Sequence, residues 1–404
     1  MKNSKTFLCI SNFFKGADFL IQLKKQGNQV YLVTSDKLKD EAWPHDYIDE
    51  IFYMEGQDVD WNLDHLLLGV VNFMKSTNVD SIVALDDYDV EKATYLRENL
   101  RISGMGQTTG RYFRDKLAMR MRAKSCGIPV PAFCSLFNDH DINTFADTVQ
   151  APWVFKPRSE ASATGIIKVF DKVCLWIRIN VMGNSRFKYL LEQFKPGDVY
   201  HCDSLIFDGK VIFSITSKYL ATPMEISHNG GVFRTANIKY NSEDDKAIKK
   251  VNDEVMKGFG LKFGVAHTEF IKSNETGQIY FLETSSRVGG AHIAEMIAEA
   301  SDINVWKEWA KIEDCLAKET KYSLPKIKKG YAGIALTLSK DKHPDLSSFS
   351  DSEVCFRVPL EYHAGLIVKS EKQERVFELL EEYGNRLATD FTAIVEQVKV
   401  DKLH

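Results

Sequence analysis

Residues 263–287, FGVAHTEFIKSNETGQIYFLETSSR, carry the pattern that most restricts what this chain can fold into. Two apolar, β-branched stretches, Val265–Ile271 and Gln278–Glu283, flank Asn274–Gly277, whose Asn and Gly residues favour a reversing turn. Each stretch also holds one glutamate where an apolar residue is expected. The pattern therefore predicts an antiparallel hairpin with an acid on each strand.

The two glutamates, Glu269 and Glu283, are spaced as cross-strand neighbours around a short turn would be. Because side chains alternate between the faces of a strand, both carboxylates can point to one side. Two carboxylates held close together in a partly dry site repel each other unless a cation lies between them, and Mg²⁺ prefers hard oxygen ligands of this kind. Two solvent-facing glutamates on an edge hairpin fit the pattern alone equally well.

The overall composition argues against several classes of protein. The chain has 404 residues, enough for two or three domains, and its 52 basic and 56 acidic residues give a net charge of −4. This balance disfavours a nucleic-acid partner or an anionic membrane surface, and no apolar run reaches the length of a membrane span. The N-terminal apolar stretch is broken by Ser11 and Asn12, so Thr6–Ile10 predicts a core strand rather than a secretory signal.

The seven cysteines are scattered, odd in number and contain no C-x-x-C pair. This usage disfavours both a disulfide framework and a zinc site. We therefore expect reduced thiols and a cytoplasmic location.

The first hundred residues alternate strand and helix patterns. Apolar or β-branched runs at 6–10, 29–34 and 79–85 alternate with helical patterns at 15–26 and 64–76. This rhythm predicts an open sheet of parallel strands with crossover helices. The acidic cluster at residues 86–89 follows the last strand, at the strand end where such sheets bind ligands, but capping of the next helix is the interpretation we favour.

Residues 103–110, SGMGQTTG, are only superficially similar to a dinucleotide-binding loop. Their spacing is G-x-G-x-x-x-G and they follow a helical pattern rather than a strand, so we predict a linker. A helix from Tyr112 to Cys126 is expected next, because Gly127 and two prolines follow it.

From Ala151 onward the pattern becomes antiparallel. The stretches PWVFKPR and TGIIKVF predict a hairpin, and Asp208-Gly209 predicts a turn between two further strands. Lys156 is costly to bury unless it meets an anion, and the small residues after it can bring backbone N–H groups close to phosphate oxygens. Glu192, in LLEQF, could accept a hydrogen bond from the exocyclic amine of a base. Taken alone, an exposed loop explains the lysine equally well, and an ordinary strand edge explains the glutamate better.

The C-terminal part predicts a smaller unit. Two strands, at 330–338 and in HAGLIVKS, precede an amphipathic helix from Lys372 to Leu387. His363, at the start of the second strand, is read as a packed or capping residue rather than a catalytic base.

Four stretches occur in one order: RDKLAMRMRAKSCGIPVP, PWVFKPRSEASATGIIKV, LEQFKPGDVYHCDSLIFDG and GVAHTEF…GQIYFLETSSRVGGAHI. In this order they resemble the ATP-grasp superfamily, and within it the carboxylate–amine ligases that include bacterial dipeptide-forming ligases. The resemblance covers nearly the whole chain and implies an α/β protein that is α+β in part. It implies an N-terminal open parallel α/β domain (1–110), an ATP-grasp domain with antiparallel sheets (111–325) and a small, lid-like α+β unit (326–404).

The resemblance also implies ATP as the nucleotide and assigns contacts to it. Lys116 and Lys156 would contact the nucleotide phosphates. Ser159, Ser162 and Gly165 would lie in the loop that closes over these phosphates. Glu192 and the backbone of Phe194 would face adenine. The glycine-x-acid pattern that often binds ribose appears as Gly197-Asp198-Val199. Because Val199 cannot accept a hydrogen bond from a hydroxyl, this role passes to Asp198, to Asp203 or to no residue.

For the metal, the resemblance implies that Glu269 and Glu283 hold Mg²⁺, with Mn²⁺ as an alternative. Arg287 would stabilise the transferring phosphoryl group or the acyl phosphate, so Arg287 and Lys156 are the expected catalytic residues. Family members usually carry Glu-x-Asn at the second metal motif, whereas Ser285 takes the place of that Asn here. Its hydroxyl is a weaker ligand than an amide carbonyl.

The leading hypothesis is an ATP-dependent ligase that joins a small-molecule carboxylate to an amine through an acyl phosphate, giving a peptide-like amide, ADP and phosphate. In MEISHNGGVFRT, Glu225 and His228 are candidates for contacts to the amine and Arg234 for the carboxylate. The alternatives are a carboxylase or nucleotide-biosynthesis enzyme of the same superfamily and a weakly catalytic ATP-binding protein. We expect no nucleic acid or membrane as a partner, and a homodimer as the assembly.

Overall fold

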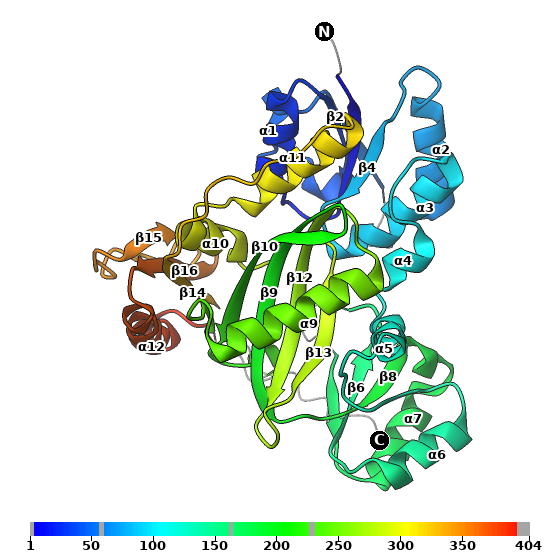
Figure 1. Cartoon of the computed structure of the whole chain (residues 1–404), viewed down its shortest axis with the longest axis vertical. Helices are drawn as coiled ribbons and strands as arrows, with labels where there is room; N and C mark the ends of the chain where they lie inside the picture. The colour runs from blue at the N-terminus through cyan, green and yellow to red at the C-terminus, as the bar shows by residue number, and fades with distance from the viewer. Residues whose placement is uncertain (1–3, 56–59, 161–164, 225, 227–230, 394–404) are drawn as a thin grey trace.

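The computed structural model describes residues 4–55, 60–160, 165–224, 226 and 231–393, which form three β-sheets and the helices that cover them (Figure 1). The N-terminal sheet is parallel, as expected, and has the strand order β3-β2-β1-β4. Its strands are β1 (Thr6–Ser11), β2 (Gln29–Ser35), β3 (Glu50–Met54) and β4 (Ser81–Ala84). Its helices are α1 (Ala17–Lys25), α2 (Leu63–Phe73), α3 (Val90–Leu100) and the short α4 (Gln107–Arg111).

Strand β1 shows why this sheet needs helices on both faces. Phe7 and Cys9 pack with Phe19 of α1, whereas Leu8 and Ile10 pack with residues of α2 and α3, among them Leu66. A parallel strand buried on both faces carries the continuous apolar run that the sequence shows here.

The region predicted as a linker and a helix differs in detail from the prediction. Part of residues 103–110 forms the helix α4, and α5 spans Lys116–Ser125 rather than starting at Tyr112. The start of α5 is fixed by Asp115, whose carboxylate accepts hydrogen bonds from the N–H groups of Leu117 and Ala118.

A small antiparallel sheet lies at the lower right of Figure 1, with the order β5-β8-β6-β7. Its elements are β5 (Phe133–Ser135), α6 (Asp139–Thr148), β6 (Trp153–Pro157), β7 (Ile167–Val169), α7 (Lys172–Met182) and β8 (Tyr189–Gln193). The predicted hairpin of PWVFKPR and TGIIKVF is confirmed by the pairing of β6 with β7. Helices α6 and α7 bury their apolar residues against this sheet.

The third sheet is the largest and has the order β13-β12-β9-β10-β11-β14-β16-β15. Its strands are β9 (Gly197–Phe207), β10 (Lys210–Tyr219), β11 (Phe233–Asn237), β12 (Gly264–Ser273), β13 (Ile279–Ser285), β14 (Tyr331–Leu338), β15 (Val354–Arg357) and β16 (His363–Ser370). Both predicted hairpins, β9–β10 and β12–β13, are confirmed, and Glu269 lies directly opposite Glu283.

Helices cover both faces of this large sheet. Helix α9 (Glu243–Phe259) crosses the face that Ile206 and Phe270 present to it (Figure 1). On the opposite face, α10 (Ile293–Ser301) and α11 (Val305–Ala317) share one apolar core with the N-terminal sheet. Because strand residues alternate between faces, His201 and Asp203 of β9 and His267 and Glu269 of β12 all point to this second face.

The C-terminal segment continues the large sheet instead of standing apart from it. Strand β14 pairs with β11, and Phe233 lies opposite Leu336. Helix α12 (Gln373–Asp390) then packs on this end of the sheet. The predicted boundary between residues 325 and 326 falls between α11 and β14, while the sheet runs across it; the three-domain division stays a prediction.

Two expectations about the chain environment can be compared with the structure. No helix among the described residues is long and apolar enough to cross a membrane. All seven cysteines lie in the described ranges, and none of them forms a disulfide.

Candidate active site

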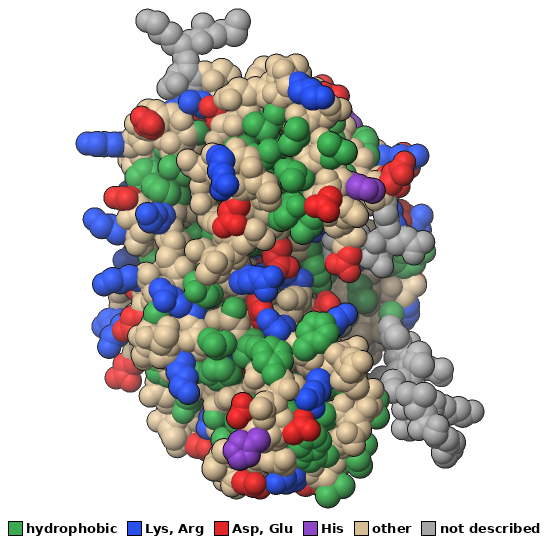
Figure 2. Space-filling view, turned by 90° about the vertical axis from the view of Figure 1, so that its right-hand side faces the viewer, with side chains coloured by type: hydrophobic (Ala, Val, Ile, Leu, Met, Phe, Trp, Pro, Cys, Tyr) green, Lys and Arg blue, Asp and Glu red, His purple; other side chains and the backbone are tan. Residues whose placement is uncertain are grey.

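A cavity of about 810 Å³ is lined by residues from all three sheets and their connections. Its volume is in the range of small-molecule sites, about 300–1,000 Å³. In Figure 2, acidic and basic side chains gather at mid-height, between the N-terminal part above and the small sheet below. Most of the predicted site residues line this cavity: Lys116, Lys156, Glu192, Phe194, Glu269, Glu283, Ser285 and Arg287.

The two predicted phosphate-binding lysines reach the cavity from different elements and are both paired with acids. Lys116, the first residue of α5, places its Nζ 2.8 Å from Oε2 of Glu283 and 2.6 Å from the backbone oxygen of Glu160. Lys156, on β6, places its Nζ 2.5 Å from Oε2 of Glu192. Both side chains remain partly accessible from the cavity, so an anion of higher charge can compete with the carboxylates for them.

Glu192 is buried between two cations. Its carboxylate accepts from Arg120, which is fully buried, and from Lys156. Burial alone would raise the pKa of Glu192, but Arg120 and then Lys156 override it and hold the pKa below its ordinary value. Glu192 is therefore an ionised hydrogen-bond acceptor at the cavity wall. The N–H of Phe194 already donates to the oxygen of Pro152, so its carbonyl is the backbone group left for a base.

The predicted phosphate loop is described only at its two ends. Ser159 is half-buried, and Gly165 adopts a left-handed φ of 72°, which favours glycine at the return of the loop into β7. At the first end, Glu160 accepts a hydrogen bond of 3.2 Å from the Tyr88 hydroxyl of the N-terminal domain. Ser162 lies outside the described residues.

The paired acids Glu269 and Glu283 have the surroundings expected of a cation site. Glu283 is neutralised by Lys116, and Oε1 of Glu269 accepts a hydrogen bond of 2.8 Å from Tyr219 and lies 3.7 Å from Nε2 of His267. Burial alone would raise the pKa of Glu269, but His267 and Tyr219 lower it. Glu269 is therefore an ionised oxygen donor, and it faces the same cavity as Glu283. The two carboxylates fit a Mg²⁺ ion, with Ser285 on the same strand as Glu283.

Arg287 is held by an acid of the N-terminal domain. Its Nε and Nη2 donate to Oδ2 of Asp87 over 2.8 and 2.7 Å, and its Nη1 donates to the carbonyl of Val288. A guanidinium has five N–H groups, so two are left, one on each terminal nitrogen. These form a fork suited to a carboxylate or a phosphoryl group. Burial alone would raise the pKa of Asp87, but Arg287 holds it well below its ordinary value.

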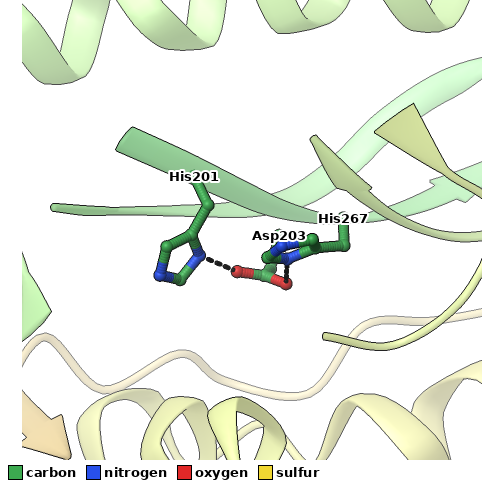
Figure 3. A group of neighbouring side chains, drawn as sticks. All are labelled: His201, Asp203 and His267. Atoms are coloured by element: carbon green, nitrogen blue, oxygen red, sulfur yellow. Dashed lines mark hydrogen bonds and ion pairs between the residues drawn. The ribbon is translucent and has the colours of Figure 1, made fainter. Parts of the chain in front are cut away.

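His201, Asp203 and His267 form a buried cluster (Figure 3). It lies beside Glu269, through the contact of His267 with that residue. Asp203 accepts from Nδ1 of His201 over 2.6 Å and from Nδ1 of His267 over 2.8 Å, and Nε2 of His201 lies 2.8 Å from the Thr235 hydroxyl. Burial alone would lower the pKa of His267, but Asp203 raises it to about 9.

These three side chains have ligand atoms close enough to be considered as a metal site. Ligands around a tetrahedral zinc ion with bonds of about 2.1 Å would lie roughly 3.4 Å apart. The observed N–O separations of 2.6 and 2.8 Å are hydrogen-bond lengths instead. We therefore read the cluster as a hydrogen-bonded support that fixes His267 next to Glu269.

Two predicted contacts do not fit the positions that the structure gives them. Asp203 does not line the cavity, because both its oxygens are occupied by the histidines beneath the surface. Arg234 points to the C-terminal unit, where its Nη1 lies 2.9 Å from Oε2 of Glu381. Sequence reasoning could not separate these polar residues from cavity residues, since their strands have polar positions on both faces. Glu225 and His228 lie outside the described residues.

Other cavity residues were not predicted as part of the site: Asp87, Arg114, Tyr219 and His267. Capping of the next helix was the favoured interpretation of the acidic cluster, and it was wrong. Asp86 caps the short 3-10 turn Asp87–Asp89, where its carboxylate accepts from the N–H of Tyr88, and Asp89, at the N-cap of α3, makes no side-chain capping hydrogen bond. A signal for Asp87 was its place after β4, at the ligand-binding end of a parallel sheet. A signal for His267 was its spacing of two from Glu269, which puts both on one strand face.

Comparison with known proteins places this geometry in context. No protein-family model matches the chain. The chain is 26% identical over 247 residues to the L-arginine-specific L-amino acid ligase of Bacillus subtilis, which covers 59% of this chain and 58% of that protein. It is 20% identical over 191 residues to the D-alanine–D-alanine ligase of Neisseria gonorrhoeae, covering 46% of this chain and 62% of that protein. The matches thus span less than two thirds of these relatives.

Among solved structures, the L-amino acid ligase of Bacillus licheniformis superposes with a TM-score of 0.75. The superposition covers 98% of this chain and 100% of that one, at 17% sequence identity. The homologues are thus L-amino acid and D-alanine–D-alanine ligases, and the fold is that of the ATP-grasp enzymes of the carboxylate–amine ligase type, as the sequence predicted.

Proposed function

We propose that this chain is an ATP-dependent carboxylate–amine ligase that forms a peptide-like amide through an acyl phosphate and releases ADP and phosphate. One observation carries the proposal. The paired acids Glu269 and Glu283 face the same cavity as the cations Lys116, Lys156 and Arg287. This arrangement offers oxygen donors for a metal and positive charge for a triphosphate, and the likeness to known ligases supports it.

The residues divide the work of the first step. Lys116 and Lys156 bind the phosphates and hold the γ-phosphate in place, while Arg287 presents its two remaining N–H groups to the reacting carboxylate. Mg²⁺ held by Glu269 and Glu283 would supply positive charge against the phosphate oxygens. A carboxylate oxygen attacks the γ-phosphorus, the bond to ADP breaks, and an acyl phosphate forms.

In the second step an amine nitrogen attacks the acyl carbon, the carbon–oxygen bond breaks, and inorganic phosphate leaves. The amine loses a proton in this step, and the amide is the product. Water has to be excluded, because it would hydrolyse the acyl phosphate. Part of the cavity wall is apolar, with Val199, Ile271 and Leu282 among its residues. Because these side chains offer no hydrogen bonds to water, they disfavour water molecules next to the acyl phosphate.

The experiment that tests the function follows nucleotide and phosphate products with a mixture of amino acids. We expect ADP and inorganic phosphate, formed only when both a carboxylate and an amine are present. Glu269→Gln should abolish the reaction, whereas Glu275→Gln, in the turn of the same hairpin, should leave it intact. Binding of ATP without amino-acid-dependent turnover would support the weakly catalytic ATP-binding alternative. Turnover that needs bicarbonate would support the carboxylase alternative.

The proposal includes ATP and Mg²⁺, with Mn²⁺ as an alternative metal, and small-molecule carboxylate and amine substrates. A cytoplasmic location and a homodimer belong to it as well. The free cysteines support the location. Sedimentation of the purified protein tests the dimer.

A further inference from the structure

The two carboxylate oxygens of Glu269 have different surroundings. Oε1 accepts a hydrogen bond of 2.8 Å from the hydroxyl of Tyr219, and Nε2 of His267 lies 3.7 Å from the same oxygen. Oε2 forms no hydrogen bond or ion pair with the residues that the structure describes. Glu269 therefore presents to the cavity one oxygen that the protein occupies and one that it leaves open.

Tyr219 is held in place by the large sheet. It is the last residue of β10, is 6% exposed and lines the cavity, and its hydroxyl reaches across β9 to Glu269 on β12. Its ring lies 4.9 Å from the ring of His201 and meets the ring of Phe233 edge-on at 5.7 Å. Because turning the ring would break both contacts, the hydrogen bond to Glu269 is a fixed feature of the sheet.

The number of oxygens that a carboxylate offers matters for the choice of cation. Mg²⁺ requires about six ligands in an octahedral arrangement, whereas Ca²⁺ takes about six to eight and often uses both oxygens of one carboxylate. At Glu269, Tyr219 takes up one of the two lone pairs of Oε1, and His267 approaches the same oxygen. The protein thus competes with a cation for Oε1, and binding through Oε2 alone suits the smaller ion.

We propose that Tyr219 holds Glu269 as a one-oxygen ligand and thereby makes the site select Mg²⁺ over Ca²⁺. This inference rests on the proposed function, in which Glu269 and Glu283 hold the metal. Tyr219 is a positioning residue, because it acts on the metal through Glu269. The side chain of Glu283 is 30% exposed and pairs with Lys116, so it is less constrained than Glu269, whose side chain is 16% exposed. Discrimination between the ions therefore depends on Glu269.

The test measures metal binding rather than turnover. Mn²⁺ is bound to the full chain saturated with ADP, free Mn²⁺ is followed by electron paramagnetic resonance, and Mg²⁺ or Ca²⁺ is added to displace it. A parallel titration of ADP alone corrects for the ions that the nucleotide binds in solution. In the unaltered protein, Mg²⁺ should displace Mn²⁺ at a concentration about tenfold or more below that of Ca²⁺. Equal displacement by the two ions would overturn the proposal, independently of any variant.

Tyr219→Phe removes the hydroxyl and keeps the ring between His201 and Phe233. With Oε1 of Glu269 released, we expect the affinity for Ca²⁺ relative to Mg²⁺ to rise by about tenfold or more. The matched control is Tyr200→Phe, since the Tyr200 hydroxyl donates to a carboxylate of α9 over 3.1 Å and the residue does not line the cavity. That variant loses the same kind of hydrogen bond, and its preference for Mg²⁺ should persist.

A purely structural role for Tyr219 predicts a different result. Tyr219→Phe would then weaken the binding of both ions equally and leave their ratio unchanged, which would refute the selecting role. The metal site itself is tested separately with Glu269→Gln. Unchanged Mn²⁺ affinity in that variant contradicts the metal site of the proposed function. Loss of Mn²⁺ binding there, together with an unchanged ratio in Tyr219→Phe, contradicts only the role of Tyr219.

Discussion

At the scale of single residues, the charges of the cavity are balanced in pairs before a ligand is present. Lys116 pairs with Glu283, Lys156 with Glu192, and Arg287 with Asp87. Because each pair joins a predicted phosphate-binding or catalytic cation to an acid, an incoming triphosphate has to replace a carboxylate at the two lysines. The acid released from Lys116 is one of the two expected metal ligands, so phosphate and metal binding should support each other.

The first prediction concerns Lys156. Lys156→Met should weaken ATP binding by about 10- to 150-fold, since a charge-assisted hydrogen bond to phosphate is worth about 1.5–3 kcal/mol. Calorimetric titration of ATP measures the effect. Lys172→Met is the control, because Lys172 lies on α7 and pairs with Asp147 away from the cavity. Unchanged ATP affinity in the folded Lys156 variant would refute the assignment.

The second prediction ranks the two residues of the second metal motif. Glu283→Gln should reduce turnover by about 100-fold or more and Ser285→Ala by much less, because a carboxylate supplies formal charge to Mg²⁺ and a hydroxyl supplies only a neutral dipole. Turnover is measured as a function of Mg²⁺ concentration. If the serine variant needs more Mg²⁺ than the glutamate variant, the ranking of the ligands is wrong.

At the scale of elements, the strands of the large sheet decide which polar side chains meet. Alternation along β9 and β12 puts His201, Asp203, His267 and Glu269 on the face covered by α10, away from α9. The connection after β13 passes so close to the cluster that a side-chain carbon at Gly289 would lie 2.9 Å from Oδ1 of Asp203. The histidine cluster is therefore enclosed by the same connection that carries Arg287.

The third prediction tests this close approach. Gly289→Ala should destabilise the fold by about 1–3 kcal/mol, because the added methyl group would also lie 3.0 Å from Nδ1 of His267. Gly290→Ala is the matched control, since nothing lies within 4 Å of a carbon added there. Denaturant unfolding of both variants measures the difference. Equal unfolding free energies of the two variants would show that the connection after β13 shifts to accommodate the methyl group without loss of stability.

The fourth prediction concerns the charge at the centre of the cluster. Asp203→Asn should cost about 3–5 kcal/mol at pH 7, because it removes the anion between two buried imidazoles. The histidines hold the pKa of Asp203 below its ordinary value against the opposing effect of burial. The carboxylate thus stabilises the fold above its unfolded pKa of about 3.9, and this contribution is lost as the pH falls further.

The stability gap between the unaltered protein and Asp203→Asn should therefore narrow as the pH is lowered below about 4. Denaturant unfolding across this pH range measures it. Asp198→Asn, on the same strand but half-exposed and paired with Lys218, should change stability by no more than about 1 kcal/mol. A gap that stays constant down to the lowest pH would contradict the pairing.

Local patterns predicted the elements well where one signal dominates. The hairpins β6–β7, β9–β10 and β12–β13 combine turn residues with apolar strands, and the pairing of Glu269 with Glu283 follows from them. The sequence patterns did not predict strand β3 or helices α6, α7 and α11. Helix α11 nevertheless packs in the apolar core that the N-terminal sheet shares with the large sheet. Contacts between distant segments could not be predicted from local sequence patterns. Asp87 and Arg287, for example, form a hydrogen bond because whole sheets pack together, and no local pattern encodes that packing.

At the scale of the whole molecule, the cavity depends on all three sheets being held in place. One apolar core runs from Phe19 of α1 through Trp309 of α11 to Leu205 of the large sheet. This continuity positions Asp87 of the N-terminal part against Arg287 of the central part. Four sequence motifs, each weakly specific by itself, predicted this architecture through their order along the chain. The continuation of the large sheet into β14 and β16 was seen only in the structure.

The fate of the carboxylate oxygen tests the central claim most directly. Amino acids labelled with ¹⁸O in the carboxylate are incubated with the enzyme, ATP and Mg²⁺, and the products are analysed by mass spectrometry. Attack of the carboxylate on the γ-phosphorus predicts that ¹⁸O appears in inorganic phosphate, that ADP is the nucleotide product, and that full turnover requires the amine. Label in AMP, a stable phosphorylated product, or full turnover without an amine would contradict the ligase mechanism.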